Sequence, residues 1–137
     1  MHRVRRLHWL MLSLIVAAVL TSVAQLDARG SVTVDIGKYA ALVDAGQAVE
    51  IEVEVSCTAS YKPLEAFVYV VQDGYTSQFA GIPVRCTNHV QKYVVVVRAF
   101  PDSPFHAGEA YASAYLLVQS PTGATVSGGD AHPIEIR

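Results

Sequence analysis

Three histidines, His89, His106 and His132, are the side chains downstream of the N-terminal segment best suited to acid–base or metal chemistry. A zinc centre needs three or four converging ligands, commonly with two close in sequence, whereas these are 17 and 26 residues apart. We therefore interpret them as loop residues in water. The sequence also contains no G-x-S-x-G, no H-E-x-x-H and no glycine-rich phosphate loop. We predict neither a catalytic set nor a cofactor, and hence a protein that is not an enzyme.

Oxygen ligands for calcium are also scattered along the chain. Asp102, Glu109 and Asp130 occur singly, whereas calcium takes several oxygen ligands at once. We therefore predict no metal site.

Two cysteines offer the other obvious chemistry. Cys57 ends a run, residues 49–57, in which apolar and polar residues alternate without a break. Successive side chains of a strand point to opposite faces, so this cysteine belongs to the core side of a half-buried strand. An isolated cysteine pair in an exported protein is most simply a disulfide. We predict a disulfide between Cys57 and Cys86 that closes a loop of 30 residues.

The polar side of the same run carries three glutamates, Glu50, Glu52 and Glu54. Neighbouring charges on one face of a strand lie about 6.8 Å apart and favour a basic strand beside them. Lys92 and Arg98, which share one parity of a predicted strand at 91–100, could provide it. We interpret the stripe as a solvated sheet face with some ion pairing. The alternative is a site for a cation or a basic partner.

Tyrosines at alternate positions point to a different kind of surface. Residues 109–119 place alanines on one parity and Tyr111 and Tyr115 on the other. If the alanines face the core, both tyrosines stand outside, where Phe67 and Tyr69 of a neighbouring strand would join them. Tyrosine combines a large contact area with a polar tip, which suits interfaces. These four residues form a candidate binding face; in the alternative arrangement the tyrosines fill the core.

Short β-prone runs make up the rest of the chain, without a convincing 3.6-residue period. Asp73-Gly74 suits a two-residue hairpin turn with positive φ. About seven strands are expected, at 31–36 with a continuation to 43, 49–57, 64–72, 75–79, 91–100, 109–119 and a last strand closed by Ile134 and Ile136. Residues 82–86 are expected to be a short strand or an extended stretch. Such short connections join antiparallel neighbours. The sequence therefore predicts an all-β, antiparallel two-sheet immunoglobulin-like sandwich over residues 25–137.

The chain resembles small secreted bacterial proteins with one immunoglobulin-like domain and two cysteines. The residues that carry the resemblance are the cysteine of the 49–57 strand, Phe105, Gly108, Ala110 and Ala112. It implies the sandwich fold but no established activity. Antibody-type domains differ in two respects, because here Cys86 precedes the 91–100 strand and Trp9, the only tryptophan, lies in the N-terminal segment. Antibody-like partners are therefore not implied.

Residues 1–24 are predicted to be a signal peptide. Three arginines precede an apolar run at 10–20, and Ser22-Val23-Ala24 offers a cleavage site. The run is shorter than the roughly 20 residues of a membrane-spanning helix; an uncleaved anchor is the alternative. Cleavage leaves 7 basic and 12 acidic residues, a net charge of −5. An acidic chain without a basic cluster argues against nucleic acid and anionic membranes as partners.

Together these features predict an exported, non-catalytic β-sandwich module, secreted or otherwise extracytoplasmic. Its role would be to bind a protein, a glycan or an envelope component, or to serve as a structural element. A small-molecule carrier is the alternative from a second class, although antibiotic-binding sandwiches have two disulfides beside their cleft. An enzyme is the third alternative, and it would require strand-end residues to converge around a nucleophile and a base.

Overall fold

The computed structural model describes residues 32–137. The predicted signal peptide, its cleavage site and Trp9 lie outside the described residues. The described part of the chain contains eight strands and one turn of 3-10 helix, Asp44–Gly46, but no α-helix. No helix within it is long and apolar enough to cross a membrane. This part of the chain is therefore all-β, as predicted.

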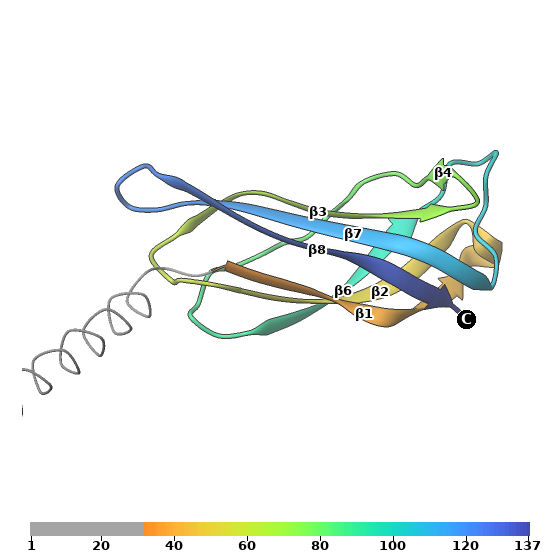
Figure 1. Cartoon of the computed structure of the whole chain (residues 1–137), viewed down its shortest axis with the longest axis horizontal. Coiled ribbons are helices and arrows are strands. Elements are labelled where there is room, and N and C mark those ends of the chain that lie inside the picture. Colours follow the sequence, from red (N-terminus) through yellow and green to blue (C-terminus); the bar gives the residue numbers. More distant parts are fainter. Residues whose placement is uncertain (1–31) are drawn as a thin grey trace, which may run out of the picture. The chain divides into compact units, whose positions relative to one another are not determined.

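The strands are β1 Val32–Val43, β2 Ala48–Cys57, β3 Lys62–Gln72, β4 Tyr75–Thr76, β5 Ala80–Gly81, β6 Gln91–Arg98, β7 Gly108–Gln119 and β8 Thr125–Ile136 (Figure 1). They form one sheet in the order β4-β3-β7-β8-β1-β2-β6, and β5 also pairs with β3. All pairs are antiparallel except β1 with β8, which is parallel.

This connectivity differs from the predicted antiparallel two-sheet sandwich. β1 pairs with β2 over most of its length, but Tyr39 and Ala40 also pair in parallel with Glu135 and Ile136 of β8. The two halves of the fold, β4-β3-β7-β8 and β1-β2-β6, are thus joined into one curled mixed sheet. The sequence pattern does not predict the pairing of β1 with β8, because two parallel strands at opposite ends of the chain are not joined by a short turn that could be recognised in the sequence.

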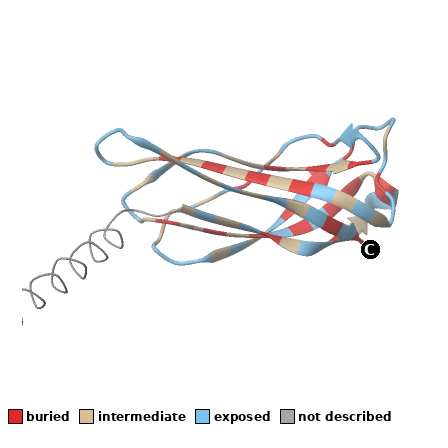
Figure 2. Ribbon diagram, viewed as in Figure 1, coloured by how far each residue is buried: buried red, intermediate tan, exposed pale blue. Residues whose placement is uncertain are grey.

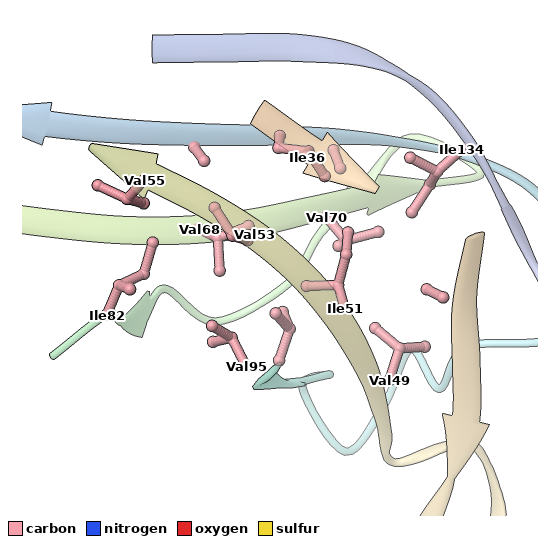
Figure 3. Close-up of a cluster of buried hydrophobic side chains, with 14 of the residues drawn as sticks. Ile36, Val49, Ile51, Val53, Val55, Val68, Val70, Ile82, Val95 and Ile134 are labelled. Carbon is pink, nitrogen blue, oxygen red and sulfur yellow. The ribbon is translucent and has the colours of Figure 1, made fainter. Parts of the chain in front are cut away.

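The two halves of the curled sheet enclose one hydrophobic core. Figure 2 shows buried and exposed residues alternating along the strands, and Figure 3 shows side chains of β2, β3 and β6 converging. In β2 the apolar parity of the 49–57 run is buried, as predicted, with Val49, Ile51 and Val53 fully inaccessible. Full burial of an aliphatic side chain contributes about 1.5–3 kcal/mol. The alternation is therefore the main energetic reason why this segment is a strand.

Cys57 and Cys86 form the predicted disulfide, with an S–S distance of 2.05 Å and a Cα–Cα distance of 4.7 Å. Cys86 lies in an extended segment between β5 and β6, so residues 82–86 form the extended stretch and not the short strand, the two forms that the sequence allowed. Pro83 lies in this segment and lacks the N–H that a central strand would donate. The backbone N–H of Asn88 donates to the carbonyl of Cys57 at 3.0 Å. The bridge and this bond fasten the segment to the end of β2.

The turn between β3 and β4 has the conformation that its sequence predicts. Asp73 and Gly74 adopt φ values of 53° and 81°, and Gln72 pairs with Tyr75 across them. Two successive positive φ values match the right-handed twist of a two-residue hairpin. The returning strand is shorter than predicted, since β4 ends at Thr76 instead of residue 79.

The glutamate stripe of β2 faces solvent beside β6. Lys92 Nζ lies 3.1 Å from Glu52 and 3.9 Å from Glu54, which agrees with the predicted pairing. The hydrogen bond with Glu52, aided by its charge, raises the pKa of Lys92. Arg98 does not join the stripe; it lies opposite Ala48 at the strand end and contacts Asp44 at 3.5 Å.

Candidate functional site

The alanine side of β7 faces the core. Ala112 and Ala114 are buried, whereas Tyr111 keeps 45% of its surface exposed. Because strand side chains alternate, Tyr111 and Tyr115 both lie on the outer face. The alternative arrangement, with the tyrosines in the core, is therefore wrong.

The outward side chains of β3, β7 and β8 stand in rows across the sheet. The successive rows are Phe67, Tyr115 and Gly129; Tyr69, Ser113 and Ala131; Val71, Tyr111 and Pro133. The four residues singled out in the sequence therefore share one surface. We call Phe67, Tyr69, Phe79, Tyr111 and Tyr115 the aromatic face.

Phe67 is at the centre of the ring contacts in this face. Its ring centroid lies 5.2 Å from Phe79, 5.6 Å from Tyr115 and 6.5 Å from Tyr69. Phe79 also meets Tyr69 edge-on at 5.1 Å. Aromatic pairs at such distances contribute about 0.5–1.5 kcal/mol beyond area burial. These contacts hold the rings against one another.

Phe79 is the member of the face that sequence reasoning missed. It was assigned to the returning strand of a hairpin, but it lies between β4 and β5, where strand alternation does not apply. The pairing of Ala80 with Val68 and of Gly81 with Phe67 carries it to the outer face. Phe79 is 67% exposed. Because Phe79 contacts the rings of Phe67 and Tyr69, it adds to the exposed apolar area of the aromatic face.

The surroundings of the aromatic face are small or acidic. On β8, the outward residues beside Tyr115 and Ser113 are Gly129 and Ala131, which have no side chain or a small one. Glu65 borders one end of the rows, and Glu109 and Glu135 stand opposite each other at the other end. None of the described outward residues in these rows is basic. The face thus combines aromatic rings, hydroxyl groups and bordering carboxylates.

His106 and Asp73 form a histidine–carboxylate pair beside a pocket of about 110 Å³. The hydrogen bond that His106 donates to the Asp73 carboxylate, aided by the one to the carbonyl of Ala107, raises the pKa of His106. A Ser–His–Asp relay needs the second ring nitrogen to face a nucleophile. Here Nδ1 lies 2.9 Å from the Ala107 carbonyl oxygen, and the hydroxyl of Ser77 in the pocket donates to Gln78. The pair fastens the β3–β4 turn to the loop before β7 and does not form such a relay.

His132 is predicted from the sequence to be a loop residue in water, and this prediction is wrong. His132 lies on β8 with 28% of its side chain exposed. One of its ring nitrogens lies within 4.8 Å of a carboxylate oxygen of Asp35 and of one of Asp130. Its Nε2 is 2.9 Å from the carbonyl oxygen of Ile36, and its Nδ1 is 2.8 Å from that of Pro133. Both ring nitrogens are thus directed at backbone carbonyl oxygens of the chain. The cluster is a hydrogen-bonded clamp.

No protein-family model matches the chain, and no curated protein does. Among solved structures, a β-glucosidase from Listeria innocua aligns over 79% of this chain and 16% of its own, with 10% identity and a TM-score of 0.38. The sporulation control protein Spo0M from Bacillus subtilis aligns over 79% of this chain and 49% of its own, with 12% identity and a TM-score of 0.39. The chain thus spans less than half the length of either structure.

Proposed function

We propose that this chain is an exported, non-catalytic module of immunoglobulin-like type that binds a protein, glycan or envelope component through its aromatic face. The observation that carries the proposal is the ring cluster on the outer side of β3 and β7. Phe67 and Tyr115 pair across the strands, while Phe79 is 67% exposed and Tyr111 45% exposed. Rings that are held in place and still accessible give contact area at a low entropic cost on binding.

Two further features support an extracytoplasmic location. The sequence carries a signal-like N-terminal segment, and the cysteines lie at disulfide distance. Disulfides persist in oxidising compartments outside the cytoplasm. Nucleic acid is not a proposed partner, because the acidic rims of the aromatic face would repel phosphates.

Binding is tested by presenting the purified protein to an extracytoplasmic fraction and to immobilised envelope glycans. The double variant Tyr111→Ala/Tyr115→Ala should lose the captured ligand. A matched control, Val94→Ala/Val96→Ala, removes exposed side chains from the outer face of β6 and should keep it. If every ligand stays bound to the tyrosine double variant, the aromatic face is not the binding surface.

Export is tested separately by the intact mass of the protein recovered outside the cytoplasm. The exported chain is expected to begin at Gln25. Its mass should be two hydrogens below that of the same chain with both cysteines reduced. A mass that includes residues 1–24, or one that shows two free thiols, would contradict the proposed compartment.

A further inference from the structure

Two polar side chains, Asp130 and His132, occupy the core-facing parity of β8. In the ladder between β7 and β8, Asp130 is paired with Ala114 and His132 with Ala112, and both alanines are buried. A charged or polar pair on the core side of a strand requires hydrogen-bond partners. The partners come from the backbone of β1, which is 94 and 96 residues away in the sequence.

At this point β1 and β8 lie side by side without main-chain pairing. The register of β1 breaks between Ile36 and Ala40, and its ladder with β8 begins only at Tyr39. Ile36 therefore presents a backbone N–H and C=O to β8 that no strand backbone receives. The carboxylate of Asp130 accepts the N–H at 2.8 Å, and His132 Nε2 lies 2.9 Å from the C=O. Side chains thus take the place of two ladder hydrogen bonds.

The acceptors around His132 determine its protonation state. A neutral imidazole has one donor nitrogen and one acceptor nitrogen. Both nitrogens here face carbonyl oxygens, those of Ile36 and Pro133, which can only accept. Both contacts are hydrogen bonds only when both nitrogens carry protons.

We propose that the His132 imidazolium and the Asp130 carboxylate form a proton-dependent clamp that fastens the amino-terminal half of β1 to β8. The clamp is a conformational device separate from the aromatic face, which lies on the other side of the sheet. Loss of the proton leaves one ring nitrogen with its lone pair against a carbonyl oxygen, and the contact becomes repulsive. Of the two hydrogen bonds between Ile36 and β8, only the one to Asp130 then remains.

The charges that face His132 come from three strands. Asp130 on its own strand approaches Nε2 to 3.3 Å, and Asp35 stands on β1. The open hollow beside the ring, about 1040 Å³, is also lined by Lys38 and Tyr39 of β1, Glu109 of β7 and Glu135 of β8. Arg137 offsets part of this charge, because it pairs with Glu135 at 3.6 Å and lies over the Tyr39 ring. The carboxylates of Asp130 and Asp35 are the charges that favour the imidazolium.

The direction of the pH effect follows from this environment. The hydrogen bond to Pro133, then that to Ile36 and the charges of Asp130 and Asp35, raise the pKa of His132 against the effect of partial burial. A group whose folded-state pKa is raised stabilises fully below its unfolded value of about 6.5, and loses that effect as pH rises through the folded value. The clamp should therefore be closed in mildly acidic medium and open in alkaline medium.

The first test is an NMR titration of the histidine rings in the full folded domain. At pH 6 both nitrogens of His132 should carry protons, and its titration midpoint should lie above the ordinary histidine value of about 6.5. A midpoint at or below about 6.5, or a ring with one bare nitrogen at pH 6, would overturn the clamp.

The second test follows amide hydrogen exchange at each end of the seam. The Ile36 amide, held by Asp130, should lose protection at least several-fold between pH 6 and pH 9 after correction for intrinsic exchange. The Leu42 amide, which donates to the Arg137 carbonyl at 2.8 Å, should not. Equal changes at both amides would contradict a local clamp.

A variant separates the clamp from general effects of pH on stability. His132→Gln keeps a donor for Ile36 but cannot titrate, so its melting temperature should fall less than that of the wild type from pH 6 to pH 9. His89→Gln is the matched control and should follow the wild type. A His132-dependent stabilisation by added Zn²⁺ at neutral pH would also overturn the proposal, because it would show that a ring lone pair is free.

Discussion

Phe67 on β3 and Tyr115 on β7 stand directly opposite each other on the outer face of the sheet, with their ring centroids 5.6 Å apart. The same Phe67 ring contacts Phe79 and Tyr69. One outward side chain therefore organises rings from two strands and from the segment between β4 and β5. The face proposed to bind a partner is also a source of stability for the sheet that carries it.

Phe67→Ala should lower the free energy of unfolding by about 1–3 kcal/mol, because it removes three ring contacts at once. Tyr111→Ala is the control, since Tyr111 takes part in none of these ring pairs and is 45% exposed. Its loss should cost less than about 1 kcal/mol. Chemical denaturation measures both changes. Equal losses would mean that the rings do not stabilise one another.

The disulfide should stabilise the fold mainly by restricting the unfolded chain. Cys57 and Cys86 close a loop of 30 residues, for which chain entropy predicts about 3.5 kcal/mol. Guanidinium denaturation with and without a reductant measures the difference. A Cys57→Ala/Cys86→Ala variant is the control, and its unfolding midpoint should not respond to the reductant.

Gln72 is the polar residue on which the β7 end of the fold depends. It is 6% exposed; its Nε2 donates to the carbonyls of His106 and Glu109 at 3.0 and 3.1 Å, and its Oε1 accepts the His106 N–H at 3.0 Å. Gln72→Leu should cost about 2–4 kcal/mol, because it leaves three backbone groups without this partner.

The control for that change is Gln119→Leu. Its amide makes a long 3.4 Å contact with Gly123 at the surface, so a cost within about 0.5 kcal/mol is expected. Thermal unfolding of both variants compares them. A Gln72→Leu variant as stable as Gln119→Leu would show that water replaces the buried amide without loss.

Gly128 permits the close approach of β1 to β8. A Cβ at this position would lie 2.8 Å from Val32 Cγ1 and 3.2 Å from the Val32 carbonyl oxygen. Gly128→Ala should therefore destabilise the protein by about 1–3 kcal/mol through overpacking. Gly81→Ala, whose added Cβ would meet only the Ala66 oxygen at 4.0 Å, is the control and should change little. Denaturation midpoints of the two variants check the difference.

Local patterns in the sequence were sufficient for several features. The strand alternation ending at Cys57, the positive-φ turn at Asp73-Gly74 and the cysteine pair all agree with the structure. Each of these depends on side-chain parity, on a dipeptide's conformational preference or on the count of one residue type. Such properties are present in the chain before any long-range contact forms.

Parity alone left open which side of β7 faces the core, and the tertiary structure decided it by burying Ala112 and exposing Tyr111. The curled mixed sheet, the place of Phe79 among the rings and the clamp of His132 on Ile36 were likewise decided only by the fold. The physical reason is the same in each case. These features join segments that are distant in the sequence, and a strand's own pattern specifies which residues share a face but not which distant strand will lie beside it.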